Sequence, residues 1–159
     1  MERRITEEQV TKALLNWLES NGWQIITFDF PQSGTGYSLH PNVELRTTKN
    51  KGSFIPDIVA IKNETVVFFE NKDRFVLSDF LKVEELKSTQ GYKKSTEKLL
   101  KNFSYLKIFY GVGLAHSVKT EQKTNENLEK VDFVIFLHQD NSVSVTFDTN
   151  EIFGQVKLG

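Results

Sequence analysis

Two short hydrophobic runs around a polar dipeptide constrain the fold of this chain more than any other feature. The segment PDIVAIKNETVVFFENKDR, residues 56–74, has apolar residues on both sides of Asn63-Glu64. Runs rich in β-branched and aromatic residues and separated by a short polar turn are typical of a β-hairpin. The segment therefore predicts two adjacent antiparallel strands, at about residues 54–61 and 65–70.

The register of this hairpin predicts where its charged residues meet. A two- or four-residue turn centred between Asn63 and Glu64 pairs residues whose numbers sum to 127, so that Asp57 lies opposite Glu70. Side-chain alternation places Lys72 on the same face. Directly opposed residues have Cβ atoms roughly 4.5–5.5 Å apart, so two carboxylates meet beside one ammonium group. A three- or five-residue turn would shift the register by one and weaken this prediction.

Two carboxylates at such a separation predict a metal site. They repel each other and raise one carboxyl pKa unless a cation lies between them. Mg²⁺ is commonly bound by one or two carboxylates together with waters and phosphate oxygens. We therefore expect the apolar parts of the hairpin to build the core and its charged end to bind a metal ion.

The remaining pattern predicts one α/β domain over residues 1–159, with a core at about 5–115 and a C-terminal addition at about 130–159. We expect a mixed central sheet flanked by helices, in the order α-β-β-β-α-β, followed by an extra hairpin. The other expected elements are a helix over 6–21 that begins at Thr6 and ends at Gly22, a strand over 23–30, a long loop over 31–53 with a short strand near 43–47, a helical stretch at about 81–100 with a break near Gly91, a strand over 106–115, a hairpin of 132–138 with 142–148, and a short helix over 150–156.

Composition narrows the chemistry that this chain can perform. It has 159 residues, enough to bury a core, and a net charge of -1. The absence of cysteine excludes thiol catalysis, disulfides and thiolate zinc sites. The sequence contains no run of about 18 apolar residues and no pattern of a secretory signal, so we expect a cytoplasmic protein without a membrane partner.

The charged residues of the hairpin also resemble a known signature. Pro56-Asp57, twelve intervening residues and then Glu70-Asn71-Lys72 resemble the PD-(D/E)xK nuclease superfamily, which includes many restriction endonucleases and Holliday junction resolvases. The resemblance covers roughly residues 5–110 and implies a restriction endonuclease-like core. It implies that Asp57 and Glu70 bind Mg²⁺, for which Mn²⁺ can substitute, and that Lys72 orients or activates the attacking water. Gln90 resembles a helix glutamine found near the site in several branches.

The superfamily often adds an acidic residue from the first helix. In the resolvase-like pattern this acid would fall at Thr11 of this chain, which is a departure from the pattern. Glu7 and Glu8 lie one turn earlier, and Glu7 shares the face of the apolar residues of the predicted helix. We therefore expect Glu7, ahead of Glu8, to be a third metal ligand.

Two groups of basic residues are candidates for contacts with DNA phosphates. They are Lys93, Lys94 and Lys98 in the helical stretch and Arg46, Lys49 and Lys51 in the long loop. The lysines also fit the solvated face of a helix, and composition leaves both interpretations open.

Taken together, these features predict a Mg²⁺-dependent DNA endonuclease, either a small type II restriction-type enzyme or the cleavage subunit of one. Cutting both strands of double-stranded DNA takes two active sites, so we expect a homodimer or a complex with a partner subunit. A Holliday junction resolvase-like nuclease is the alternative within the same class. A non-catalytic nucleic-acid-binding or assembly module on the same scaffold is the alternative outside it.

Overall fold

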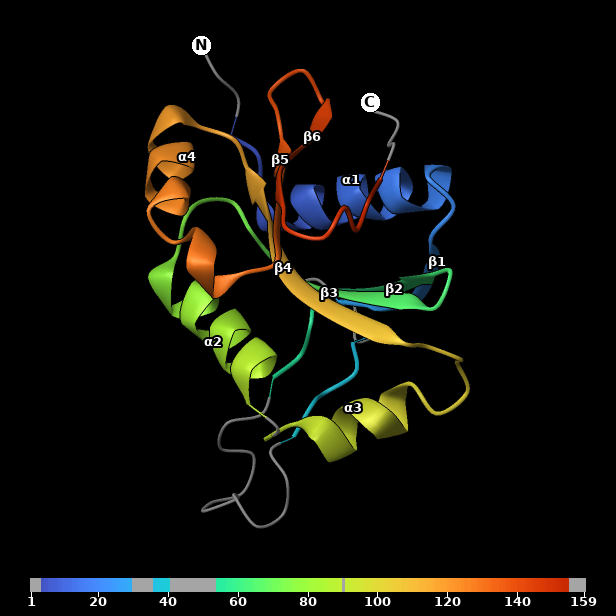
Figure 1. Cartoon of the computed structure of the whole chain (residues 1–159). Coiled ribbons are helices and arrows are strands. Elements are labelled where there is room, and N and C mark those ends of the chain that lie inside the picture. Colours follow the sequence, from blue (N-terminus) through green and yellow to red (C-terminus); the bar gives the residue numbers. More distant parts are fainter. Residues whose placement is uncertain (1–3, 30–35, 41–53, 90, 155–159) are drawn as a thin grey trace.

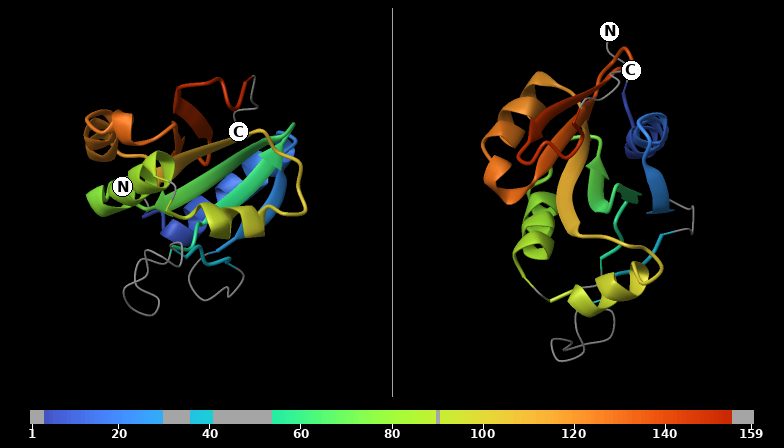
Figure 2. Two further views of the ribbon diagram at one scale, coloured as in Figure 1. Left: turned by 60° about the horizontal axis from the view of Figure 1, so that its bottom comes forward. Right: turned by 45° about the vertical axis from the view of Figure 1, so that its right-hand side comes forward.

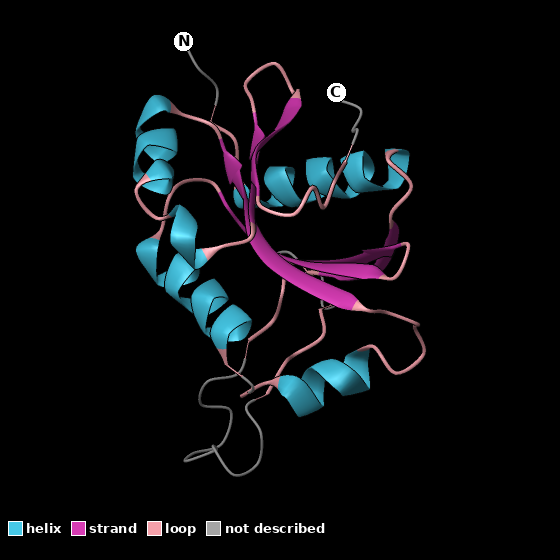
Figure 3. Ribbon diagram, in the orientation of Figure 1, coloured by secondary structure: helices cyan, strands magenta, loops and turns pink. Residues whose placement is uncertain are grey.

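The computed structural model describes residues 4–29, 36–40, 54–89 and 91–154. Its six strands form one mixed sheet with helices on both faces, as Figure 1 and Figure 3 show. The elements are α1 (Glu7–Ser20), β1 (Gln24–Phe28), β2 (Ile58–Lys62), β3 (Thr65–Lys72), α2 (Leu77–Ser88), α3 (Lys93–Leu99), β4 (Lys107–Ala115), α4 (Val118–Asn125), a 3₁₀ turn η2 (Leu128–Lys130), β5 (Phe133–Leu137) and β6 (Val143–Asp148). Among the described helices, none combines the length and the apolar character needed to cross a membrane.

The order of strands along the sheet follows their order in the sequence. Strands β1, β2 and β3 pair antiparallel, β3, β4 and β5 pair parallel, and β5 and β6 again pair antiparallel. A parallel pair needs a crossover connection, and helices α2 and α3 supply the one between β3 and β4. The expected α/β architecture with a mixed central sheet is therefore confirmed.

The sheet is covered on its two faces by different helices (Figure 2). Helix α1 buries Val10, Leu14 and Leu18 against one face, and Phe153 near the C-terminus packs into the same cluster. Its ring lies 5.5 Å from that of Trp17, centroid to centroid. Helices α2 and α3 bury their apolar residues against the other face. Both faces of the central strands are thus buried, which explains why their sequences are almost continuously hydrophobic.

The first helix begins as its sequence predicts. The Thr6 hydroxyl accepts a hydrogen bond from the Gln9 amide, and the Gln9 side chain accepts one from the Thr6 amide, which completes a capping box. At the other end, Gly22 adopts φ +86°, a conformation that glycine enters without steric cost. This N-terminal cap fixes the position of the first helical turn, which carries Glu7.

The hairpin has the predicted register. Its pairs run from Lys62 with Thr65 to Ile58 with Phe69, and each pair sums to 127. The two turn residues Asn63 and Glu64 have φ of 49° and 66°, the positive values that a two-residue type I′ turn requires. Strand β2 begins at Ile58 rather than near residue 54, because Phe54 instead bridges to Leu39.

One predicted helix is absent from the described residues, and one observed helix was not predicted. Residues 150–154, the described part of the expected final helix, form turns and bends instead, because the Asp148 carboxylate accepts the Ile152 and Phe153 amides. Helix α4 was not predicted, since its sequence is almost entirely polar and buries threonines, Thr120 and Thr124, rather than an apolar stripe. The break near Gly91 was confirmed between α2 and α3. The short strand expected near 43–47 lies outside the described residues.

The strain in the hairpin turn leads to a stability prediction. We expect Glu64→Gly to stabilise the protein, because relief of a left-handed conformation of roughly 1–2 kcal/mol exceeds the entropic cost of glycine, about 0.4–1 kcal/mol. A net gain of about 1 kcal/mol would raise Tm by roughly 2–4 °C in a thermal unfolding experiment. Ser104→Ala is the control, since Ser104 donates to the Glu64 carboxylate at 3.3 Å. A Tm of Glu64→Gly at or below that of the wild type would contradict this interpretation.

Candidate metal centre

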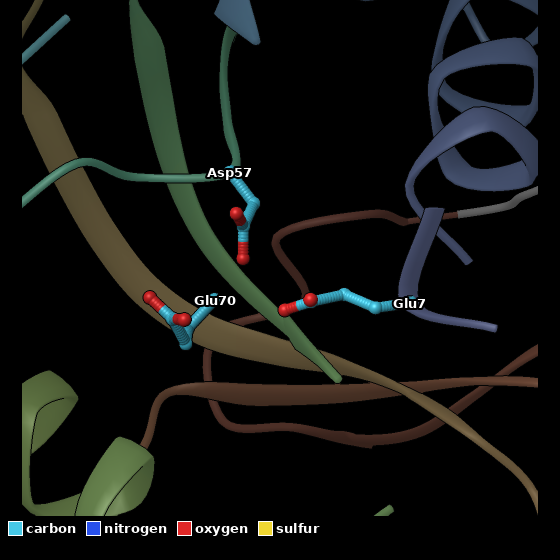
Figure 4. Close-up of side chains that lie close together, drawn as sticks. All are labelled: Glu7, Asp57 and Glu70. Carbon is cyan, nitrogen blue, oxygen red and sulfur yellow. The ribbon is translucent and has the colours of Figure 1, made fainter. Parts of the chain in front are cut away.

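Three carboxylates from three separate segments converge at one end of the hairpin (Figure 4). Glu7 lies in the first turn of α1, Asp57 lies just before β2, and Glu70 lies near the end of β3. Each offers an oxygen, and these three oxygens all lie within 4.8 Å of one another. The sequence predicted Asp57 and Glu70 from the hairpin register and Glu7 from its helical face, and the structure brings all three together.

The backbone of both neighbouring strands fixes Asp57. Its amide donates to the Phe69 carbonyl at 2.9 Å, and its carbonyl accepts the Asp29 amide at 2.8 Å. Its carboxylate accepts the Asn71 amide at 2.7 Å. The regular ladder ends one pair earlier than expected, at Ile58 with Phe69, so Asp57 is not held opposite Glu70 by ladder pairing. Its own hydrogen bonds hold it instead, and the two acids still meet.

A buried hydrogen bond joins α1 to β3 beside the acids. The Asn71 side-chain amide donates to the Thr11 hydroxyl at 3.1 Å, and both residues are buried. Gly113 leaves the room for this contact, because a Cβ at that position would lie 2.5 Å from the Asn71 side-chain oxygen. Thr11, the position at which the resolvase-like pattern places an acid, therefore has a structural role in this chain. Glu7, one turn earlier on α1, is the residue that reaches the other carboxylates.

Lys72 is held between two acids. Its ammonium nitrogen lies 3.3 Å from the Glu7 carboxylate and 3.7 Å from that of Asp79 in α2. Burial alone would lower the pKa of Lys72, but Asp79 and Glu7 outweigh it and raise this pKa, so the side chain is a stable cation. Lys72 thus links the helix on one face of the sheet to a helix on the other.

Asp79 is the functional candidate that the sequence prediction missed. One of its carboxylate oxygens is buried and has no hydrogen-bond partner among the described residues, and the Lys72 ammonium lies near it without reaching hydrogen-bond distance. A signal was available, because Asp79 is an acid in the first turn of the helix that follows the Glu70-Asn71-Lys72 strand. The first turn of α2 lies beside the end of β3, where Asp79 contacts Lys72.

Burial raises the carboxyl pKa of two of these acids, Asp57 and Glu70. Burial, partly offset by the Asn71 hydrogen bond, raises the pKa of Asp57 to about 7. Burial, followed by repulsion from Asp57 and Asp79, raises the pKa of Glu70 to about 9. The two groups titrate as a pair, and a cation placed among their oxygens would remove the conflict.

These observations fit a hard divalent cation. The ligands available are carboxylate oxygens from Glu7, Asp57 and Glu70, and such ions prefer oxygen ligands. Three protein ligands leave coordination positions for waters and for a phosphate, which is the arrangement that Mg²⁺ commonly adopts with its substrates. The raised carboxyl pKa values show that ionising Asp57 and Glu70 is unfavourable without a cation, and a bound ion would offset this free-energy cost.

The other predicted site residues lie elsewhere. Glu8 pairs with Lys12 at 3.6 Å and does not join the three acids. Lys93, Lys94 and Lys98 are exposed on α3, which covers the face of the sheet opposite α1 (Figure 1). Gln90, Arg46, Lys49 and Lys51 lie outside the described residues.

Comparisons with known proteins found no matching family model, no matching curated protein and no matching solved structure. The assignment of a function therefore depends on the residues and their geometry.

The raised carboxyl pKa values predict an unusual pH dependence of stability. In the presence of a chelator, we expect the Tm difference between Glu70→Gln and the wild type to grow in favour of the variant as the pH rises from about 5 to about 9. A raised carboxyl pKa contributes stability below its unfolded value, near 4.3, and that contribution is lost as the pH approaches the folded value of about 9. The glutamine side chain does not titrate in this pH range, so the variant lacks this loss of stability.

Glu8→Gln is the matched control for this measurement, because Glu8 is a surface acid that pairs with Lys12 outside the cluster. Its Tm difference from the wild type should not follow the same trend with pH. A constant difference between Glu70→Gln and the wild type across this pH range would mean that Glu70 is not held protonated.

Proposed function

We propose that this chain is a Mg²⁺-dependent endonuclease that hydrolyses phosphodiester bonds in DNA. The observation that carries the proposal is the convergence of Glu7, Asp57 and Glu70, with Lys72 held beside them by Glu7 and Asp79. Structural ion pairs do not require three acids from separate segments to converge, two of them shielded from solvent, around one point. Such an arrangement is costly without a cation, so it favours a site that uses one.

Each residue has a distinct role in this proposal. Asp57, Glu70 and Glu7 supply the oxygens that bind the ion, and a bound Mg²⁺ supplies electrophilic stabilisation of the phosphate charge and activates water. Lys72 presents a permanent positive charge toward the same region and stabilises the negative charge that develops on the phosphate. Asp79 positions the Lys72 ammonium through their 3.7 Å contact. No nucleophilic side chain is needed.

The finer assignment is to a small type II restriction-type endonuclease or the cleavage subunit of one. It is supported by the element order α1, β1, β2, β3, α2, α3, β4, which matches the order that the signature implies for a restriction endonuclease-like core once the broken helical stretch is counted as one. A homodimer or a complex with a partner subunit would supply the second active site that a double-strand cut requires.

The central prediction is metal-dependent cleavage. The purified protein, incubated with plasmid, linear duplex and four-way-junction DNA, should cut with Mg²⁺ and not with chelator. Asp57→Asn and Glu70→Gln should each reduce the cleavage rate at least ~100-fold. This is the size of the loss when an enzyme loses one group that stabilises the charge developing in the transition state. A gel read at several times measures these rates. Cleavage only of the junction would favour the resolvase-like alternative.

Glu7→Gln and Glu8→Gln form a matched pair for the same assay. Both remove one negative charge from adjacent positions of α1, but only Glu7 lies among the site acids. We expect Glu7→Gln to weaken cleavage and raise the Mg²⁺ concentration needed, and Glu8→Gln to behave as the wild type. Cleavage that survives in Asp57→Asn would refute the site, and no cleavage of any substrate would favour the binding module.

The exposed lysines of α3 predict salt-dependent DNA binding. Replacing Lys93 and Lys98 by alanine should weaken binding and reduce the slope of log affinity against log salt by about 0.9 for each phosphate that the variant no longer neutralises. Fluorescence anisotropy with a labelled duplex, in chelator to prevent cleavage, measures this slope. Replacing Lys119 and Lys123 of α4, which are also exposed, is the charge-matched control. Equal slopes in the two double variants would remove α3 from the DNA interface.

A further inference from the structure

A hollow lies outside the metal centre, between the end of α2 and the start of α3. Its volume is about 260 Å³, and residues from both helices and from β4 line it. This is slightly below the roughly 300–1,000 Å³ of pockets for drug-sized ligands. The hollow therefore has room for one planar ring system. Leu86 and Ile108 provide apolar walls.

Three tyrosines distinguish this hollow from an ordinary groove between helices. Tyr92, Tyr105 and Tyr110 all line it. The Tyr110 ring packs in a tilted arrangement against that of Phe68, with ring centroids 5.1 Å apart and an interplanar angle of 35°. Phenol rings are platforms on which nucleobases stack without regard to sequence. The lining is thus chemically suited to a flat aromatic ligand.

One of these phenols also lacks a hydrogen-bond partner within the described part of the chain. Burial, followed by repulsion from Asp132, raises the pKa of Tyr110 to about 12, so the phenol stays protonated. No hydrogen bond to its hydroxyl comes from any group in the described ranges. This hydroxyl is not one of the fully buried polar atoms without a partner, so solvent and a ligand with an acceptor atom can both reach it. Nucleobase ring nitrogens and carbonyl oxygens are such acceptors.

Two lysines and one glutamate line the hollow. Lys93 lines it and has no carboxylate partner among the described residues, and Lys98 is exposed on the same helix. Lys87 also lines it but is held 3.3 Å from the Asp132 carboxylate. Glu97 is the acidic lining residue, and it can accept a hydrogen bond from an exocyclic amino group of a base. Lysines beside aromatic rings are the usual combination for binding unpaired nucleotides.

The hollow lies close to the metal centre along the sheet. Tyr110 of β4 is in register with Phe68 of β3, and Glu70 follows Phe68 by two residues. Two residues along a strand span about 7 Å and return to the same face. The hollow and the metal centre therefore adjoin the same face of the same two strands, two residues apart along the sheet.

We propose that this hollow binds a single unstacked nucleobase of the nucleic-acid substrate. The proposal rests on the proposed function, because it assigns to that site a further contact with the same substrate. The tyrosine rings stack on the base, and the lysines of α3 contact the adjacent phosphates. Moving a base out of the duplex costs unstacking free energy. Duplexes in which a base is already extrahelical should therefore bind best.

The test compares two duplexes with the same backbone and charge. One carries a single-nucleotide bulge with 2-aminopurine, and the other has an abasic bulge at the same position. Stacking on aromatic side chains contributes about 1–3 kcal/mol per base, so the wild type should bind the 2-aminopurine bulge roughly 5–150-fold more tightly. Anisotropy in chelator gives both affinities, and 2-aminopurine fluorescence should fall on stacking.

Variants of the partly exposed tyrosines identify the hollow as the binding site. Tyr92→Ala and Tyr105→Ala should reduce the affinity ratio toward one, whereas Tyr105→Phe, which keeps the ring, should preserve it. The phenylalanine variant and a thermal unfolding curve for each protein separate loss of stacking from loss of folding. Preservation of the ratio in both alanine variants, folded as the wild type, would overturn the assignment to this hollow.

The outcomes also separate this proposal from the proposed function. Equal wild-type affinities for the two bulged duplexes, with Mg²⁺-dependent cleavage intact, would overturn the base-binding hollow alone. A tyrosine-dependent affinity ratio without any cleavage would support the hollow and refute the nuclease. Binding to neither duplex would refute the hollow whatever the cleavage assay shows.

Discussion

The hydrogen bonds that hold Asp57 between β1 and β3 determine where the rest of the site lies. Its amide, carbonyl and carboxylate all bond to backbone groups of the neighbouring segments, so this acid cannot turn away from the interior. A carboxylate confined in this way must either bind a proton or meet a cation, because solvent cannot relieve its charge. Glu70 is subject to the same burial and to the repulsion of Asp57.

Lys72 and its two acidic neighbours follow from that constraint. One ammonium group balances part of the negative charge, and Glu7 and Asp79 hold it from opposite faces of the sheet. The positive charge of Lys72 does not balance Glu7, Asp57, Glu70 and Asp79 together, and the raised carboxyl pKa values express this remaining imbalance. A divalent cation would correct it with the oxygens already present.

The sequence predicted most of this arrangement where a local rule applied. The two-residue turn at Asn63-Glu64 set the register, and the register placed Asp57 near Glu70. The face of α1 pointed to Glu7. Asp79 was missed because its approach depends on the path of the chain between β3 and α2, and no periodicity encodes such a path. Helix α4 was missed because its packing uses threonines instead of an apolar stripe.

The base-binding hollow could not have been predicted for a related reason. Its tyrosines come from the start of α3, from the loop before β4 and from β4 itself, and these segments share no pattern of hydrophobic residues. Only the packing of α2 and α3 over β4 brings the three tyrosines together. Close packing would normally fill such a space with aliphatic side chains. Three tyrosine rings line the hollow, and Lys93 has no carboxylate partner within the described part of the chain, so this surface is open to a complementary ligand. The same reasoning applies at the metal centre, where the buried acids exceed their counter-charge, and both sites are complementary to parts of one phosphodiester chain.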